Sequence, residues 1–245
     1  MTNPPSDDRA PGASNGSEAP PPPEELMLSI KGVRARAGEG PGELEVELDT
    51  NRGPITVYLN PCEGKTGCVV FLSGAGGGVK GPANEVYVRL AQELVADGVT
   101  SVRVQYREPG EFEECVLDAL AACSFLKGIG AEQVVIVGHS FGGAVAVRAG
   151  ELAPISTAVV GMSSQRFGTQ EVEQLGKPLL LIHGSRDDVL DQAASQDIYD
   201  RAVEPKRLVL LDGAGHGLAE VADEVHDLLR EFITAHATLG GNPAG

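Results

Sequence analysis

The sequence is poor in aromatic residues and in positive charge. Aromatic side chains make up 4% of the 245 residues and tryptophan is absent. A core must therefore be built from Val, Leu, Ile and Ala, which is typical of a buried parallel sheet. Nineteen basic residues against 35 acidic ones leave a net charge of −16. Nucleic acids and anionic membrane surfaces both attract clustered Lys and Arg, so neither is an expected partner.

Signals for membranes, secretion and metal binding are also missing. No apolar run reaches the roughly 18 residues of a membrane helix, and the N-terminus lacks the apolar stretch of a signal peptide. The four cysteines show no CxxC spacing. Cys115 and Cys123 are eight positions apart on an expected helix, a rise of about 12 Å that is too long for a disulfide. These features favour a cytoplasmic protein with free, mostly buried thiols.

The chain divides into a long central part and two polar ends. Residues 1–25 consist largely of Pro, Ser, Gly, Ala and acidic residues, which cannot bury enough apolar surface to fold, so a disordered tail is predicted. Residues 239–245 are expected to fray. Residues 26–238 have the length and composition of a single domain.

Within the central part, strand and helix patterns alternate. Two runs of alternating apolar residues predict an opening hairpin, and buried-strand patterns then alternate with helical ones. This order predicts an α/β fold with a mostly parallel eight-stranded sheet, helices on both faces, and a site at the carboxyl ends of the strands. The expected strands are 43–49, 55–59, 68–74, 101–106, 133–140, 156–162, 177–184 and 206–213.

The pattern GxSxG, typical of a nucleophilic serine on a sharp turn, occurs twice. The match at 12–16 lies in the polar tail without a strand before it, so we assign it no function. The match at 138–142 lies between a strand pattern and a helix pattern, the order that a nucleophile elbow requires. This setting makes Ser140 the candidate nucleophile. The alternative is that Ser140 only caps the following helix.

Two later loops supply a candidate acid and base. HGSRDDVL (183–190) follows one strand and DGAGHGLAE (212–220) follows the last. With GHSFGG (138–143), these segments resemble the α/β-hydrolase superfamily, whose serine, acid and histidine occur in this order. The resemblance implies that Asp187 is the acid and His216 the base of a catalytic triad.

Other acidic residues and histidines near these motifs remain alternatives. Asp188 could replace Asp187 as the acid, whereas Asp212 is expected to be a turn residue. His183, at a strand end, is expected to make structural hydrogen bonds. His139, inside the elbow, is expected to pack against neighbouring strands or the loop that carries an oxyanion donor. The remaining histidines, His226 and His236, are expected on the surface of the closing helix.

Acyl transfer also needs donors for the developing oxyanion. The superfamily resemblance implies the backbone N–H of Phe141, which follows the nucleophile, and that of Ala75 in the loop SGAGGG (73–78). Members frequently carry His-Gly at the start of this loop, whereas this chain carries Ser73-Gly74.

The resemblance further implies a small hydrolase without a cap domain. Many relatives insert a helical cap at the position of residues 163–175, which are too few to form one. The architecture resembles dienelactone hydrolases, with Ser140 in place of their Cys. We therefore expect a serine hydrolase acting on a small-molecule carboxylic ester through an acyl-enzyme, with no metal or organic cofactor. Thioester or peptide hydrolysis, and a non-catalytic scaffold, are the alternatives.

Overall fold

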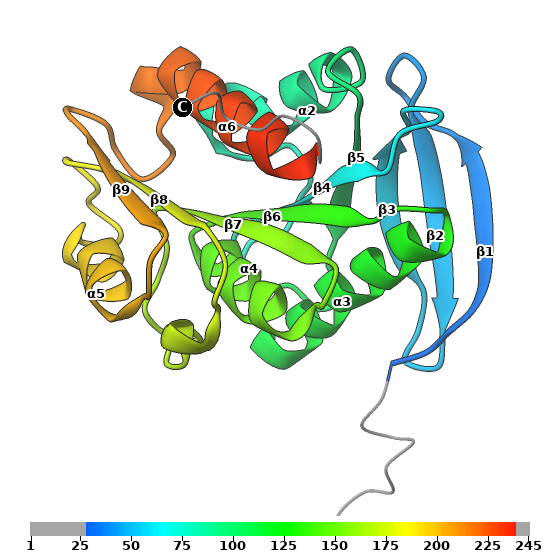
Figure 1. The fold of residues 1–245 in the computed structure, drawn as a ribbon, viewed down its shortest axis with the longest axis horizontal. Coiled ribbons are helices and arrows are strands. Elements are labelled where there is room, and N and C mark those ends of the chain that lie inside the picture. Colours follow the sequence, from blue (N-terminus) through cyan, green and yellow to red (C-terminus); the bar gives the residue numbers. More distant parts are fainter. Residues whose placement is uncertain (1–27, 239–245) are drawn as a thin grey trace, which may run out of the picture.

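A computed structural model describes residues 28–238 as one nine-stranded sheet flanked by helices (Figure 1). The predicted tails, 1–25 and 239–245, lie outside the described residues. The strand order across the sheet is β1-β2-β3-β5-β4-β6-β7-β8-β9. The strands are β1 (Ile30–Ala37), β2 (Leu44–Thr50), β3 (Ile55–Asn60), β4 (Gly67–Leu72), β5 (Val99–Gln105), β6 (Gln133–His139), β7 (Ser156–Met162), β8 (Leu179–Gly184) and β9 (Lys206–Leu211).

The sheet is mostly parallel, as predicted. Strands β5, β4 and β6 to β9 pair in parallel, and the β2–β3 hairpin and its neighbours are antiparallel. The expected count of eight strands is wrong, because β1 extends the sheet at its edge. Five consecutive residues of β1 are exposed, and Arg34 and Arg36 contact Glu47 and Glu45 of β2. Cross-strand pairing, not burial, holds this strand, so apolar periodicity does not reveal it.

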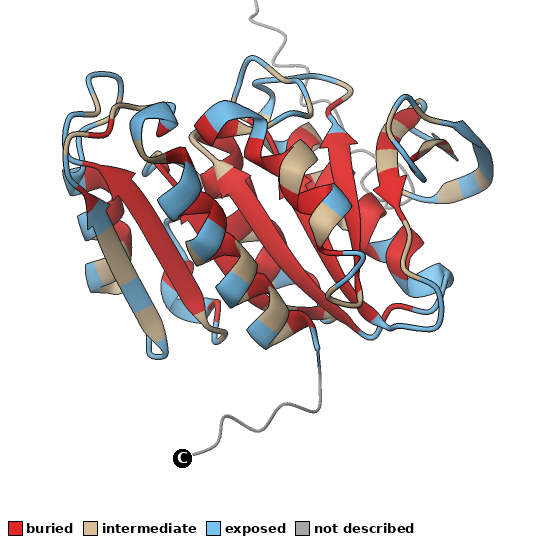
Figure 2. Ribbon diagram, turned by 90° about the horizontal axis from the view of Figure 1, so that it is seen from above, coloured by how far each residue is buried: buried red, intermediate tan, exposed pale blue. Residues whose placement is uncertain are grey.

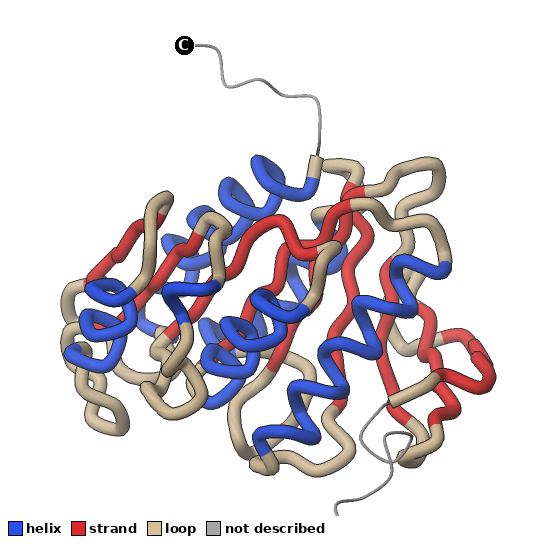
Figure 3. Tube along the Cα trace, turned by 60° about the horizontal axis from the view of Figure 1, so that its bottom comes forward, coloured by secondary structure: helices blue, strands red, loops and turns tan. Residues whose placement is uncertain are grey.

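Helices cover both faces of the sheet (Figures 1 and 3). Alternate side chains of β4 point to opposite faces, Phe71 towards one apolar layer and Leu72 towards the other. The central strands are buried along their whole length (Figure 2). One layer contains α2 (Pro82–Glu93) and α6 (Ala222–Ala237), and the other contains α3 (Phe112–Gly128), α4 (Phe141–Leu152) and α5 (Ala193–Arg201).

The sequence also anticipates the state of the thiols and the short β7–β8 connection. All four cysteines are free and three are buried. Residues 163–178 contain one short 3-10 turn, Val172–Gln174. These residues therefore leave the carboxyl edge of the sheet uncapped. In the part of the chain from 28 to 238, no helix is both long and apolar enough to cross a membrane.

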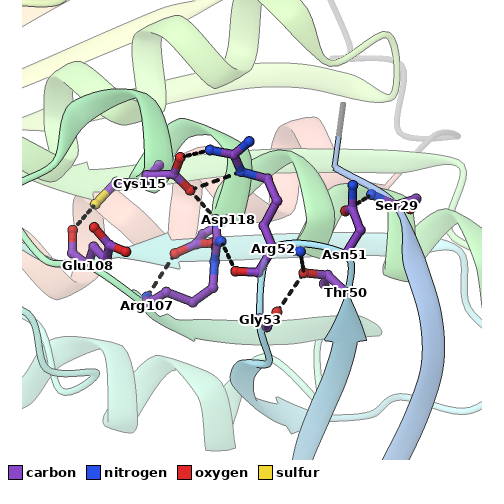
Figure 4. A network of polar contacts seen from close by, with 10 residues as sticks. Ser29, Thr50, Asn51, Arg52, Gly53, Arg107, Glu108, Cys115 and Asp118 are labelled. Carbon is purple, nitrogen blue, oxygen red and sulfur yellow. Dashed lines mark hydrogen bonds and ion pairs between the residues drawn. The ribbon is translucent and has the colours of Figure 1, made fainter. Parts of the chain in front are cut away.

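A polar network fixes the loop after β5 (Figure 4). Asp118 has no exposed side-chain surface and accepts hydrogen bonds from the backbone N–H of Arg107 at 2.9 Å and from its Nε at 2.5 Å. The Arg107 guanidinium also contacts the Arg52 carbonyl at 2.7 Å and Glu114 at 2.8 Å. The same loop carries Pro109, which packs against the glycine-rich loop after β4. The network thus stabilises the loop after β5, which in turn packs against the glycine-rich loop after β4.

We expect Asp118→Ala to lower the free energy of unfolding by about 3–5 kcal/mol, because the buried Arg107 charge loses its principal partner. Arg34→Ala is the matched control. It breaks the exposed Arg34–Glu47 pair and should cost at most about 1 kcal/mol. Urea unfolding of both variants measures the difference. Equal losses would show that the network contributes no more than a surface pair.

Candidate active site

The predicted site residues lie together at the carboxyl edge of the parallel strands. Ala75 follows β4, Ser140 follows β6, Asp187 follows β8 and His216 follows β9. Parallel strands end at the same edge, so loops separated by many residues converge there. Each candidate is held by a turn at the end of a buried strand.

Ser140 occupies a strained turn between β6 and α4. Its backbone has φ 57° and ψ −120°, a left-handed conformation that costs a non-glycine residue free energy. The turn is possible because backbones meet there at close range: a Cβ on Gly138 would lie 1.9 Å from the Gly142 carbonyl oxygen. A Cβ on Gly142 would lie 2.2 Å from the carbonyl oxygen of Ser73. The tight turn expected for a nucleophile is therefore present.

A chain of hydrogen bonds joins the three residues predicted to form the triad. Ser140 Oγ lies 3.0 Å from His216 Nε2, and His216 Nδ1 lies 2.7 Å from Asp187 Oδ2. The carboxylate can only accept, so Nδ1 carries the proton and Nε2 of the neutral ring accepts from the serine hydroxyl. Asp188, the alternative acid, is exposed to solvent. The geometry selects Asp187 as the partner of His216.

The Asp187 carboxylate is fully enclosed by donors. Oδ1 accepts from the backbone N–H groups of Val189 at 2.9 Å and Leu190 at 2.8 Å. Burial raises the pKa of Asp187, but hydrogen bonds from Leu190, His216 and Val189 outweigh it, so the pKa lies below its ordinary value of 3.8. The side chain is 0% exposed, yet it remains ionised through these contacts.

His183 makes the structural hydrogen bonds predicted for it and also approaches Asp187, the candidate acid. Its Nε2 donates to the Leu190 carbonyl at 2.9 Å and lies 3.1 Å from Asp187 Oδ2. Its Nδ1 lies 2.7 Å from the Ser195 hydroxyl, and both side chains are buried. The contact with Ser195 crosses from β8 to α5, and the sequence alone does not reveal it. His183 thus fixes the loop that carries Asp187.

His139 lies in the elbow, beside His216. Its Nε2 donates to the His216 backbone carbonyl at 2.9 Å, and the two ring centroids are 4.9 Å apart. Burial lowers the pKa of His139 to about 4, so the ring is neutral near pH 7. Because Nε2 carries the hydrogen, Nδ1 is an unprotonated acceptor.

The two expected oxyanion donors lie on neighbouring segments. Phe141 opens α4, so its N–H is one of those that helix geometry leaves without an intrahelical acceptor. Ala75 is exposed in the loop after β4. A Cβ on the preceding Gly74 would lie 3.6 Å from the Ser140 Cβ, which places this loop against the nucleophile. Ser73, which replaces the frequent histidine, is buried.

The loop of His216 is anchored by a feature that the sequence did not predict. Ala83, Asn84 and Glu85 have φ values of 49°, 55° and 63°, a left-handed turn ahead of the regular part of α2. The Ala83 N–H donates to the Gly217 carbonyl at 2.7 Å, and Asn84 Nδ2 donates to Ala219 at 3.4 Å. These contacts tie the segment to the residues that directly follow His216. Their residues give no local sequence signal, since none of the three is glycine.

Residues after β7 form one rim of the site. The Gln165 N–H lies 3.4 Å from the Ser140 carbonyl, and Phe167 is 62% exposed. Phe167 meets Phe112 edge-to-face at 5.5 Å, and Phe112 meets Phe141 at 6.0 Å. Ser164, on the same segment, is buried.

The expectation for one histidine of the closing helix is wrong. His226 is buried on α6 and lies 2.9 Å from Glu93 of α2 and 3.0 Å from Asp227. The packing of α6 against α2 covers the His226 side chain. The helical periodicity of the sequence does not specify this contact. His236 is partly exposed and stacks on Phe232.

Comparisons with known proteins agree with the fold. The sequence model of the family described as "Alpha/beta hydrolase family" matches residues 69–178, and that described as "Serine aminopeptidase, S33" matches residues 153–221. The chain belongs to the α/β-hydrolase superfamily. An uncharacterized protein of Mycobacterium tuberculosis is 29% identical over 184 residues, which are 62% of this chain and 66% of that protein. The match thus spans slightly less than two thirds of this curated relative.

Solved structures share the fold at low sequence identity. A dienelactone hydrolase from Anabaena variabilis superposes with a TM-score of 0.71 at 20% identity, covering 80% of this chain and 98% of that one. The esterase domain of a Rhodothermus marinus protein superposes with a TM-score of 0.66 at 20% identity, covering 80% and 100%. Hydrolases and esterases are thus among the structures similar to this chain.

The lowered pKa of Asp187 predicts a pH-dependent contribution to stability. A carboxyl group whose pKa is lower in the folded state than in the unfolded state stabilises the protein at pH values above the unfolded-state pKa. This stabilisation is lost as the pH falls towards the folded-state pKa. We expect the wild-type free energy of unfolding to fall more steeply below about pH 4 than that of Asp187→Asn. Urea unfolding at several pH values measures both slopes. The exposed neighbour provides the control, because Asp188→Asn should keep the wild-type slope; parallel curves for wild type and Asp187→Asn would contradict the assignment.

Proposed function

We propose that this protein is a serine hydrolase that cleaves small carboxylic esters through an acyl-enzyme. The observation that carries the proposal is the continuous hydrogen-bonded path from Ser140 through His216 to the enclosed Asp187. It begins at a strained turn in front of a helix N-terminus, where N–H groups and the helix dipole favour negative charge. This arrangement matches what activation of a serine hydroxyl requires.

The proposed reaction proceeds in two acyl-transfer steps. His216 Nε2 takes the Ser140 proton while Oγ attacks the ester carbonyl, and Asp187 stabilises the imidazolium. The N–H groups of Phe141 and Ala75 hold the oxyanion. His216 then protonates the leaving alcohol, and water, activated by the same nitrogen, releases the acid and frees Ser140.

Carboxylic esters are the favoured substrates among the acyl compounds considered. The esterase domain from Rhodothermus marinus and the dienelactone hydrolase from Anabaena variabilis share the fold, and esters or lactones are named in both. The uncapped edge leaves the nucleophile open to a small molecule. Thioester and peptide hydrolysis use the same first step and remain the alternative activities. A non-catalytic scaffold would have no need for the strain at Ser140.

A fluorophosphonate probe tests the nucleophile directly. We expect the wild type to be labelled and Ser140→Ala not to be, with esterase activity reduced by about 10³-fold or more. Ser14→Ala, at the other GxSxG match, is the control and should behave as wild type. Labelling that persists in Ser140→Ala would contradict the assignment. Wild-type protein that neither reacts with the probe nor cleaves esters would favour the scaffold.

Removing one backbone donor tests the oxyanion hole. Proline has no N–H, so Ala75→Pro should lower kcat for a p-nitrophenyl ester by about 10²–10³-fold. Ala75→Ser keeps the N–H and should stay within a few-fold of wild type. Circular dichroism and thermal unfolding establish that each variant is folded. A folded Ala75→Pro variant with the kcat of Ala75→Ser would exclude Ala75 as a donor.

A further inference from the structure

A cavity of about 380 Å³ opens beside the nucleophile, and the reaction as proposed does not explain it. Its walls are residues 73–74 and 77–82, together with His139 and Gly217, and half of these lining residues are glycines. The volume is at the small end of the range of about 300–1,000 Å³ for ligand sites. Most of the surface that lines the cavity is apolar, and its polar side chains are those of Ser73, Lys80 and His139. Any preference for a polar group must therefore come from one of these three residues.

The cavity lies on the side of the site from which an alcohol would leave. In ester cleavage the departing oxygen takes its proton from His216 Nε2, so the alcohol part must lie near that ring. Gly217 is the next residue, and the His139 ring packs against that of His216 at 4.9 Å. Gly74 lies between the cavity and Ser140, since its Cβ position would be 3.6 Å from the Ser140 Cβ.

His139 supplies a fixed hydrogen-bond acceptor to this cavity. Its Nε2 is used by the His216 carbonyl at 2.9 Å, and Nδ1 has no hydrogen-bond partner within residues 28–238. The same Cβ position on Gly74 would be 3.8 Å from Nδ1, so this nitrogen faces the cavity wall nearest the nucleophile. Lys80, the charged residue of the lining, is exposed and paired with Glu85 at 3.0 Å.

We propose that the cavity receives the alcohol part of the substrate and that His139 Nδ1 accepts a hydrogen bond from a hydroxyl group on it. The preferred substrates are then esters of hydroxylated alcohols, such as polyols, over esters of alkyl alcohols of the same shape. This inference rests on the proposed esterase activity and adds a specificity-determining residue to it. A site that pairs a substrate hydroxyl discriminates against the analogue that lacks it.

The test compares two acetate esters with alcohol parts of equal shape. In 2,3-dihydroxypropyl acetate the alcohol carries two hydroxyl groups, and in 2-methylbutyl acetate methyl groups replace them. The ratio of their kcat/KM values, measured by release of acetic acid, is the readout, because a change in general activity cancels. We expect the wild-type enzyme to favour the hydroxylated ester.

Two variants separate recognition from structure at His139. In His139→Gln the amide nitrogen can still donate to the His216 carbonyl, but the acceptor at Nδ1 is lost. We expect the ratio to fall by about 3–10-fold, the effect of one neutral hydrogen bond. In His139→Asn the amide oxygen can replace Nδ1 while the bond to His216 is lost, so the ratio should stay closer to that of the wild type. Thermal unfolding verifies that both variants fold.

Each other result would overturn the inference. An equal ratio in wild type and His139→Gln would mean that Nδ1 recognises nothing on the alcohol. An equal fall in both variants would assign His139 a purely structural role through the His216 carbonyl. A wild type that hydrolyses p-nitrophenyl acetate but shows no preference for the hydroxylated ester would refute the inference and leave the esterase intact. A wild type that cleaves no ester would refute both.

Discussion

The site depends on a close approach of backbone at the end of β6. Strand β6 and helix α4 meet where Gly138 faces the Gly142 carbonyl, and α4 meets the loop after β4 where Gly142 faces Ser73. Neither contact leaves room for a Cβ. The packing forces the intervening residue, Ser140, into a left-handed conformation and lifts its hydroxyl from the sheet. It also brings the loop of Ala75 beside the nucleophile, so the elbow and the expected oxyanion donors have one structural cause.

Two histidines at this edge hold opposite tautomers, and each is set by its neighbour. His216 carries its proton on Nδ1 because an enclosed carboxylate accepts there, which leaves Nε2 free for Ser140. His139 carries its proton on Nε2 because the His216 carbonyl accepts there. The hydrogen bond from His139 also fixes the backbone of His216. The Nε2 of His216 and the Nδ1 of His139 are thus both left as hydrogen-bond acceptors by residues that orient each other.

The sequence predicted most of the fold and the meeting of Ser140, Asp187 and His216, because both leave local patterns. Buried parallel strands read as short apolar runs, and the three loops follow them in the order that the superfamily requires. It did not predict β1, which is held by cross-strand pairs such as Arg34–Glu47. It also missed the left-handed turn at Ala83 and the contact of His183 with Ser195, since these depend on residues far apart in the chain. Tertiary contacts of this kind leave no periodic pattern in the sequence.

The surroundings of Ser140 contain two chemically different features. Phe112, Phe141 and Phe167 form an edge-to-face row, whereas glycines and a neutral histidine are among the residues that line the cavity. An uncapped hydrolase cannot enclose its substrate, so selectivity must come from such differences next to the nucleophile. If the hydroxylated part of an ester occupies the glycine-lined cavity, its carbonyl oxygen can face Phe141 N–H, and the acyl chain then extends towards the aromatic row. In that arrangement the leaving group would lie towards His216, and the polar end of a substrate would be separated from its apolar end.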